Sequence, residues 1–401
     1  MSASSTDRMS SEERLAGISL AAVFALRMLG LFLILPVFAL YASDLPSGRD
    51  LALVGVALGA YGLTQACLQI AYGAASDRFG RKPVIVFGLL LFAVGSFVAA
   101  FADDIYLVIV GRVLQGAGAI SAAVTALAAD LTREQHLTKV MAMIGSSIGL
   151  VFAVSMVGAP LLYAAIGMPG IFALTGGLAL LAIFVVLRVV PAAPMMPRQP
   201  AWQSFVEVLS HRQLLRLNFG VFALHLMLTA MWVLLPTALV KTGGLPVAEH
   251  WKVYLPALLI SFVIMVPAII AAERFARMKL LFNTAIVLLL CVQAGFGLFA
   301  GGLYGLSFWL MLFFVSFNIL EATQPSMISR IAPPHAKGAA LGVYNTTQAL
   351  GLFLGGVCGG VLTKYAGPGA VWAGGAALTV VWLLLGLTMV MPAVRPRPVA
   401  V

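Results

Sequence analysis

The sequence predicts an all-α membrane protein, because of its composition, its long apolar runs and the placement of its few charges. Of the 401 residues, 62% are hydrophobic and 9% are charged, and the mean hydropathy is +1.05. A soluble domain carries about a quarter charged residues. This chain has more apolar surface than a core can hide from water, so the composition excludes a cytosolic enzyme, a secreted disulfide scaffold and a disordered regulator.

Twelve apolar runs reach the roughly 20 residues that a helix needs to cross a bilayer. They lie near 17–41, 52–75, 84–101, 105–128, 138–165, 169–190, 215–240, 252–272, 280–301, 303–328, 338–364 and 369–391. The one long polar interval contains Pro191, Arg198 and Glu207 and divides the runs into two sets of six. We therefore expect an N-terminal six-helix bundle over 1–190, a cytoplasmic central loop over 191–214 and a C-terminal six-helix bundle over 215–401.

The positive charges predict the orientation in the membrane. An even number of spans places both termini on one side, where 18 of the 24 Lys and Arg residues lie, against 4 in the loops of the other side. The remaining 2 fall inside spans. Because cytoplasmic loops collect Lys and Arg, both termini are expected in the cytoplasm, in a multi-pass protein of the inner membrane. The net charge of +10 then reflects topology, and no nucleic-acid partner is expected.

Two loops of the sequence repeat each other. Asp77, Arg78, Phe79 and Arg81 follow the second span, and Glu273, Arg274, Phe275 and Arg277 follow the eighth at a constant offset of 196 residues. Each loop comes after the second span of a set of six. We infer a parallel duplication of a six-span unit, an arrangement in which substrate binds between the halves near the midplane of the bilayer.

The first of these loops carries a family resemblance. It reads Gly73-Ala-Ala-Ser-Asp77-Arg78-Phe-Gly80-Arg81-Lys82 and resembles the signature G-x-x-x-D-R-x-G-R-[KR] between spans 2 and 3 of the major facilitator superfamily. Gly111-Arg112-Val-Leu-Gln115-Gly116, in the fourth span, resembles the second motif of that superfamily. The resemblance implies the major facilitator fold, with 12 transmembrane helices in two pseudo-symmetric six-helix bundles.

Other stretches resemble one branch of that superfamily. In the fifth span, Gly149, Gly158 and Pro160 resemble the Gly-Pro motif of the proton-coupled drug antiporters, although Ala159 separates the glycine from the proline. Leu26-Arg27-Met28-Leu29-Gly30 is similar to the YajR-type members of the branch. Such members can carry a small soluble domain after the last span. This sequence ends soon after its twelfth expected span, so the resemblance implies a transporter without that domain.

The resemblance also assigns a role to the loop motif. In the family, the loop acid docks against the start of span 11 and the second arginine joins an acid at the end of span 4. The matching residues here imply a conformational latch that favours the outward-open state and breaks when the protein opens inward. The expected latch consists of Gly73, Asp77, Arg78, Gly80, Arg81, Lys82 and Asp130. Ordinary positive loop charge is the alternative interpretation.

Four charged or histidine side chains lie deep inside expected spans, away from their ends, where charge is costly and suggests function. Glu321 is the only deep acid, and a histidine side chain ordinarily gains or loses its proton near neutral pH, so Glu321 and His225 are expected to couple transport to protons. Arginine keeps its proton. Arg27 and Arg112 are therefore expected to tune a carboxylate, bind an anionic substrate or hold helix ends together. Each of the four has a structural alternative, such as a core histidine or a clamp on backbone carbonyls.

Polar side chains on the spans are candidates to line a substrate cavity. They are Gln65, Gln69, Gln115, Asn218, Asn318, Asn345, Gln348 and Tyr344. The glycines over 145–149 and 351–356 have the spacing of close helix approach, which predicts packing. No nucleotide-binding or hydrolase motif occurs, so ATP hydrolysis is not expected and neither a cofactor nor a metal is predicted.

These observations predict a secondary active transporter rather than an enzyme. We expect proton-coupled efflux of small hydrophobic or amphipathic compounds by alternating access, with the protein acting as a monomer in the lipid bilayer. A metabolite exporter, for a sugar or an organic anion recognised by Arg27 and Arg112, is one alternative, and a lipid flippase is another. A polytopic membrane sensor would need a soluble domain or a catalytic constellation.

Overall fold

The computed structural model describes residues 9–191 and 202–390, and every regular element in them is a helix. The elements are α1 (Ser11–Phe32), α2 (Phe38–Ala42), α3 (Leu51–Phe79), α4 (Arg81–Ala100), α5 (Ile105–Ala117), α6 (Ser121–Asp130), α7 (Glu134–Arg188), α8 (Trp202–Ser210), α9 (Arg212–Lys241), η1 (Val247–Glu249), α10 (Trp251–Arg274), α11 (Met278–Phe299), α12 (Gly302–Ile331), η2 (Pro334–Ala336), α13 (Lys337–Ala366) and α14 (Pro368–Leu387).

The number of membrane crossings agrees with the sequence. Eleven helical segments of the described residues are long and apolar enough to cross a membrane. One of them, α7, has 55 residues, and at 1.5 Å per residue it would be about 80 Å long, more than twice the thickness of a bilayer core. Its helix is interrupted at Gly167, where φ is +64°, just before Pro169. Two spans therefore lie within α7, which gives the twelve predicted crossings.

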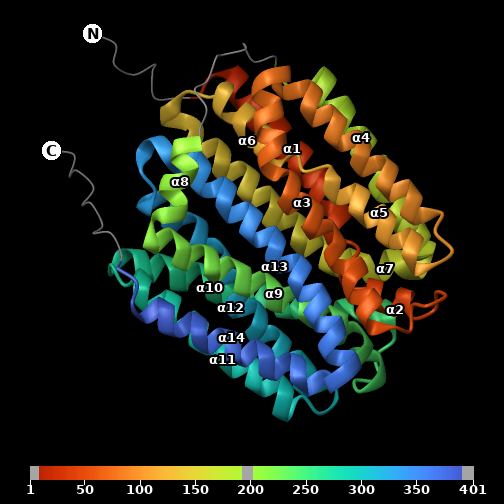
Figure 1. The fold of residues 1–401 in the computed structure, drawn as a ribbon. Helices are drawn as coiled ribbons and strands as arrows, with labels where there is room; N and C mark the ends of the chain where they lie inside the picture. The colour runs from red at the N-terminus through yellow and green to blue at the C-terminus, as the bar shows by residue number, and fades with distance from the viewer. Residues whose placement is uncertain (1–8, 192–201, 391–401) are drawn as a thin grey trace, which may run out of the picture.

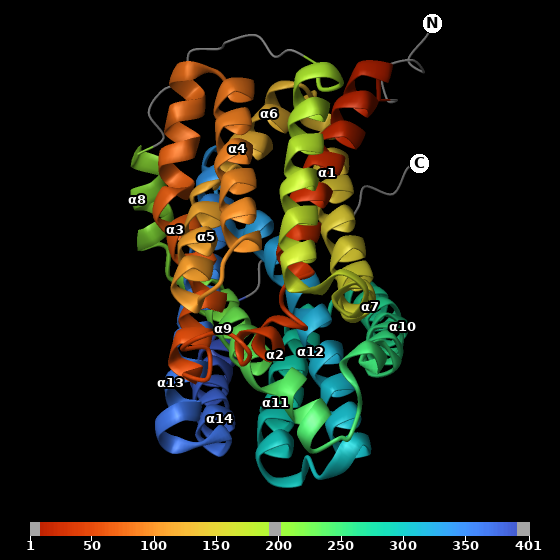
Figure 2. The same cartoon turned by 90° about the vertical axis from the view of Figure 1, so that its right-hand side faces the viewer.

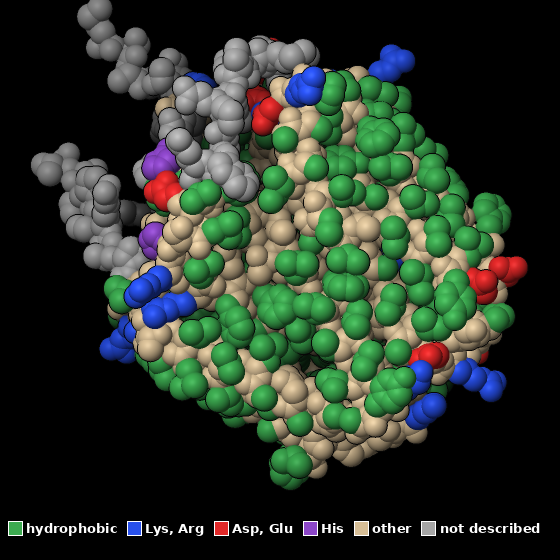
Figure 3. All heavy atoms as spheres, in the orientation of Figure 1, with side chains coloured by type: hydrophobic (Ala, Val, Ile, Leu, Met, Phe, Trp, Pro, Cys, Tyr) green, Lys and Arg blue, Asp and Glu red, His purple; other side chains and the backbone are tan. Residues whose placement is uncertain are grey.

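The helices form two bundles, α1–α7 and α9–α14 (Figures 1 and 2). We call the face where α1 begins and α14 ends the terminal face, and the opposite face the distal face. Charged side chains gather at these two edges of the molecule, and a broad hydrophobic surface lies between them (Figure 3). This is the surface that lipid tails would cover.

Glycines hold the two bundles together along the distal halves of α3 and α13. A Cβ at Gly55 would overlap the Gly356 carbonyl oxygen, and one at Gly360 would overlap that of Leu51. Toward the terminal face the end of α3 and the start of α13 lie apart (Figure 1), and a Cβ at Gly73 of α3 would meet Ala122 of its own bundle. The bundles are therefore closed against each other on the distal side, and α3 and α13 separate toward the terminal face.

The prediction that runs of glycine mark close helix packing is correct for α13 and wrong for residues 145–149 of α7. Gly355 packs against α9, where a Cβ would overlap the Leu226 carbonyl oxygen, and Gly356 packs against α3. At Gly145 and Gly149 of α7 a Cβ would meet nothing within 4 Å. The packed face of α7 lies elsewhere, since Val140 and Met143 pack against Gly17 of α1.

The chain also differs from the expected spans in local detail. The first span is interrupted between α1 and α2, and the fourth between α5 and α6 at residues 118–120. The predicted central loop, 191–214, contains the helix α8, and α9 begins at Arg212. Residues 192–201 of that loop, and the ends 1–8 and 391–401 of the predicted bundles, lie outside the described residues.

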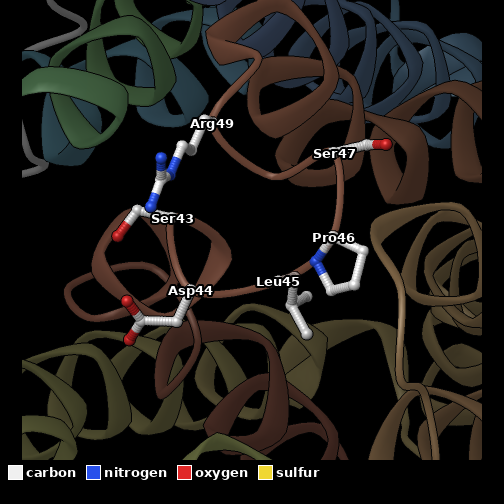
Figure 4. Close-up of a pocket in the computed structure, with 6 residues that line it drawn as sticks. All are labelled: Ser43, Asp44, Leu45, Pro46, Ser47 and Arg49. Carbon is white, nitrogen blue, oxygen red and sulfur yellow. The ribbon is translucent and has the colours of Figure 1, made fainter.

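A hollow on the distal face lies in the α2–α3 loop (Figure 4). It is lined by Ser43, Asp44, Leu45, Pro46, Ser47 and Arg49. The loop turns tightly at Gly48, where a Cβ would overlap the Ala42 carbonyl oxygen, so only glycine fits. None of the predicted site residues lines this hollow.

Candidate functional site

Three predicted residues of the C-terminal bundle meet at mid-depth. His225 comes from α9, Glu321 from α12 and Gln348 from α13. Gln348 Nε2 lies 2.7 Å from His225 Nε2 and 3.3 Å from Glu321 Oε1. His225 Nε2 lies 3.7 Å from Glu321 Oε2. We call these three residues the acid–histidine cluster.

The hydrogen bonds of this cluster fit a neutral histidine. His225 Nδ1 lies 3.1 Å from the Val221 carbonyl oxygen, which can only accept, so Nδ1 carries the proton. His225 Nε2 then accepts a hydrogen bond from the Gln348 amide. Glu321 Oε2 is buried and has no hydrogen-bond partner, although the glutamate side chain as a whole is 35% exposed. The cluster therefore has an unused acceptor that a further proton would satisfy.

Aromatic rings connect this cluster to the other bundle. The ring of Phe317 lies 5.8 Å from that of His225. Phe152 of α7 stacks on Phe317 at 6.2 Å and meets Phe314 edge-on at 6.0 Å. Tyr344, one turn before Gln348 on α13, is buried, and its hydroxyl has no partner. The cluster thus lies beside a contact between α7 and α12, where the two bundles meet.

The N-terminal bundle holds Arg27 in a polar but uncharged setting. The side chain is 0% exposed. Its Nη2 donates to the Tyr61 hydroxyl at 2.5 Å and to Gln65 Oε1 at 3.4 Å, and its Nη1 donates to the Ser121 hydroxyl at 3.2 Å. Its Nε has no partner. Arg27 therefore joins α1, α3 and α6 and keeps one unused donor.

Arg112 is held more fully. It is 1% exposed, and it donates to the carbonyl oxygens of Ala57 and Leu58 at 3.3 and 3.4 Å. Its Nη1 donates to Gln115 Oε1 at 2.8 Å, and Gln115 Nε2 in turn donates to the Ser96 hydroxyl at 2.8 Å. Of the roles left open by the sequence, this arrangement favours a clamp between α3 and α5.

The other polar candidates do not converge on one site. Asn318 donates to the Ser261 hydroxyl at 2.7 Å, between α12 and α10. Asn218 and Gln69 are buried without hydrogen-bond partners, and Asn345 is partly exposed. Pro160 lies inside α7, and a Cβ at Gly158 would meet nothing within 4 Å. Within the described residues, no three His, Cys, Asp or Glu side chains form a metal site.

The loop after α3 forms a network around Arg81. Its Nη2 lies 2.6 Å from Asp77 Oδ1, and its Nε lies 2.8 Å from Asp130 Oδ2 at the end of α6. Its Nη1 donates to the Ser76 hydroxyl at 2.6 Å. Gly80 has a φ of +92°, which glycine adopts without strain, and this lets the chain turn directly from α3 into α4.

Other predicted latch residues lie around this network. Lys82 Nζ donates to the Val190 carbonyl oxygen at 2.5 Å, and the Arg78 guanidinium lies 5.4 Å from the Phe79 ring centre. Gly73 packs near Ala122 of its own bundle. Asp77 is 48% exposed, and no side chain caps the start of α13. The contact between Asp77 and α13 that the resemblance implies is not made in this conformation.

The loop after α10 repeats this geometry. Ala276, at the offset of 196 residues from Gly80, also has a positive φ, +54°, which is uncommon for alanine. The Arg274 guanidinium lies 5.7 Å from the Phe275 ring centre, as Arg78 does over Phe79. The sequence repeat is therefore also a repeat of backbone and side-chain geometry. The ion pair differs, because here the acid Glu273 pairs with Arg330 at 2.9 Å.

Sequence reasoning missed Ser121, which begins α6 and contacts Arg27, and Tyr72, whose buried hydroxyl has no partner. One signal could have revealed Tyr72. Tyr61, Gln65, Gln69 and Tyr72 are spaced by four, four and three residues, so they lie on one face of α3. The break in the fourth span, which places Ser121, follows Gly116 and Gly118.

Comparisons with known proteins agree with this architecture. Residues 20–355 match the family model of the Major Facilitator Superfamily. The chain is 44% identical to the inner membrane transport protein YajR of Escherichia coli strain K12 over 389 residues, which cover 96% of this chain and 85% of that protein. It is 27% identical to the multidrug resistance protein MdtH of Aeromonas hydrophila over 369 residues, or 90% of this chain and 89% of that protein.

Solved structures share the fold. The human organic anion transporter MFSD10 matches with a TM-score of 0.70 at 18% identity, over 94% of this chain and 100% of that one. A mutant form of the nucleoside transporter NupG matches with a TM-score of 0.72 at 14% identity, over 93% of this chain and 99% of that one. The protein is a multi-pass membrane transporter rather than an enzyme, and it belongs to the major facilitator superfamily.

Proposed function

We propose that this transporter is a proton-coupled exporter of small hydrophobic or amphipathic compounds, located in the inner membrane with both termini in the cytoplasm. The acid–histidine cluster is the observation that carries the proposal. It holds a carboxylate and an imidazole within 3.7 Å, at membrane depth, with an acceptor oxygen of Glu321 unused. A transporter that uses a proton gradient needs a group that gains and loses a proton, and ionisable side chains inside membrane spans often serve as proton relays.

The cost of burying charge links the proton to the movement of the bundles. Glu321 is partly exposed in this conformation, in which the bundles separate toward the terminal face. Closing that face would bury the carboxylate, and an unpaired buried charge is costly. A proton or the positive charge of a substrate removes this cost. Only one of the two is needed, so the two compete, and competition for one site produces exchange.

The loop network belongs to the same cycle. Arg81 ties Asp77 to Asp130 within the N-terminal bundle, and the start of α13 is left without a side-chain cap. A helix N-terminus attracts an acid. We propose that Asp77 docks there when the terminal face closes, so that the network favours the outward-open state. The present conformation, with Asp77 exposed, corresponds to the released state.

Proton and dye movement in proteoliposomes tests this function. Ethidium serves as an amphipathic probe and pyranine reports internal pH. We expect the wild-type protein to move ethidium against its gradient only when a pH gradient is imposed, and we expect Glu321→Gln to lose this movement. Glu273→Gln is the matched control, since Glu273 lies in an exposed ion pair at the terminal face. Equal, gradient-driven ethidium transport by wild type and Glu321→Gln would overturn the assignment.

A further inference from the structure

The N-terminal bundle buries two positive charges without an acid. Arg27 and Arg112 are 0% and 1% exposed, and in the described part of the chain neither forms an ion pair with a carboxylate. A guanidinium does not lose its proton in a protein. A buried charge without a partner is costly, so the site is incomplete unless hydrogen bonds or an anion compensate it.

Only one of the two arginines has its hydrogen bonds satisfied. Arg112 is held by two carbonyl oxygens and by Gln115. Arg27 contacts a hydroxyl at each Nη and a distant amide oxygen at 3.4 Å, and its Nε–H has no acceptor. The unsatisfied donor is therefore Nε–H, and on the same edge of the guanidinium Nη2 has only the distant Gln65 oxygen besides the Tyr61 hydroxyl.

More unused polar groups lie on the face of α3 that carries Tyr61 and Gln65. Gln69 is one turn beyond Gln65, is 1% exposed and has no partner for either amide atom. Tyr72 follows on the same face, and its buried hydroxyl is also unpartnered. Buried polar groups are normally hydrogen-bonded. Arg27, Gln69 and Tyr72 together supply donors that have no acceptor.

The break in the fourth span adds a helix N-terminus to the same place. α6, ten residues long, begins at Ser121, and no side chain caps it. Ser121 is also the residue that contacts Arg27 Nη1. The N-terminus of a helix carries partial positive charge and free N–H groups, and interrupted membrane helices use such ends to bind anionic groups of substrates.

We propose that Arg27 and the start of α6 form a binding site for the carboxylate of an amphipathic compound, with Gln65 and Gln69 as the amide donors. A carboxylate fits the Nε–Nη2 edge with two parallel hydrogen bonds. It would replace the weak contact with Gln65 Oε1, whose amide could turn to donate. The rings of Tyr61 and Phe92, whose centres lie 5.7 and 6.0 Å from the Arg27 guanidinium carbon, are buried together with it, so the site has to open for the compound to enter.

This inference rests on the proposed function, since it names the chemical class of one group of its substrates. Binding of the anion and binding of the proton then belong to different bundles. The N-terminal bundle binds the negative group of such a compound, and the C-terminal bundle binds the proton or the positive charge that competes with it. Arg112, although equally buried, has no role in binding.

Benzoate and benzamide, which differ in charge but hardly in shape, test the site. Their binding to the purified full-length protein in detergent is measured by microscale thermophoresis at neutral pH. We expect the wild type to bind benzoate at least about tenfold more tightly than benzamide. Arg27→Gln should remove this preference, and Arg27→Lys, which keeps the charge but not the fork, should retain only part of it. Gln69→Leu should weaken benzoate binding alone.

A matched control keeps folding separate from binding. Arg188→Gln removes an arginine at the end of α7 and should leave the preference unchanged. Equal binding of the two compounds by the wild type, or a benzoate preference that survives in Arg27→Gln, would overturn the site. The proposed function fails differently. If ethidium movement is independent of the pH gradient while Arg27→Gln loses benzoate binding, the exporter proposal is wrong and the anion site stands.

Discussion

The two bundles carry the same fold but opposite chemistry at mid-depth. The N-terminal bundle buries Arg27 and Arg112 and no acid beside them, whereas the C-terminal bundle holds Glu321 beside His225. At the offset of 196 residues, Arg27 corresponds to Ala223 and Glu321 to Thr125. The duplication is visible in the loops and absent from the charged positions.

This difference shows which features the repeat preserves. The positive φ of Gly80 recurs at Ala276, and the cation–π contact of Arg78 recurs at Arg274, because both loops must turn one helix directly into the next. Nothing in the packing of a six-helix unit requires a charge at its centre. Charged side chains there are therefore free to differ, and they divide recognition and proton coupling between the bundles.

The largest effect is expected where the two bundles touch. Gly356→Val would force a side chain against the Gly55 carbonyl oxygen, which even a Cβ at this position would overlap. The bundles could then no longer close on the distal face, and both halves of the cycle would stop. We expect ethidium transport to fall by at least about tenfold, since an overpacked contact costs about 1–3 kcal/mol.

Gly177→Val is the control for this change, because a Cβ there meets nothing within 4 Å. Its transport should equal that of the wild type at equal amounts of protein in the membrane. Wild-type transport by Gly356→Val would mean that distal closure is not part of the cycle.

The two repeated loops give a second test. Asp77→Asn should abolish ethidium transport without reducing membrane insertion, because Asp77 belongs to the network around Arg81 and is proposed to dock on α13. Glu273→Gln, at the equivalent position, breaks only an exposed pair with Arg330 and should have little effect, since such pairs contribute about 0–1 kcal/mol. The measurement is ethidium transport by both variants in the same type of membrane. Equal losses would show that the loops act alike.

The two buried arginines of the N-terminal bundle, Arg27 and Arg112, differ in how firmly their hydrogen-bond partners hold them. Gln115→Leu removes a 2.8 Å hydrogen bond from a buried guanidinium and another from Ser96, so it should lower the free energy of unfolding by about 1–3 kcal/mol. Gln65→Leu removes only a 3.4 Å contact and should cost less. Thermal unfolding in detergent measures both. The reverse order would make Arg27, not Arg112, the structural clamp.

The smallest effect is expected at the distal ion pair between the bundles. Asp50 accepts a hydrogen bond from Lys364 Nζ at 2.8 Å, and this bond holds the pKa of Asp50 below its ordinary value of 3.8. The pair therefore supports distal closure at and above that pH and weakens as pH falls through the lowered pKa. At neutral pH, Asp50→Asn should shift closure by less than about 1 kcal/mol, as measured by spin-label distances across the face.

Most of the fold could be predicted from the sequence. The twelve apolar runs, the division into two bundles and the loop repeat all follow from hydropathy and spacing, which depend on the bilayer more than on individual contacts. The break at residues 118–120 could not be predicted, because a glycine in an apolar run is compatible with close packing as well as with a break. Gly118 is needed where a Cβ would overlap the Gly88 carbonyl oxygen.

The candidate site could be predicted only in part. The scarcity of charge singled out Arg27, Arg112, His225 and Glu321, but a sequence does not say which of them meet. Gln348 joins His225 to Glu321 from a third helix. Gln115 holds Arg112 in place through a hydrogen bond to its Nη1. These partners depend on helix rotation, which packing between helices decides.

The central claim is that the proton is carried by the C-terminal bundle alone. The direct measurement is ethidium-driven proton movement in proteoliposomes, followed with pyranine, for Arg27→Gln and Glu321→Gln side by side. The account predicts that Arg27→Gln moves protons at the wild-type rate and that Glu321→Gln moves none. Proton movement that survives in Glu321→Gln and is lost in Arg27→Gln would contradict it.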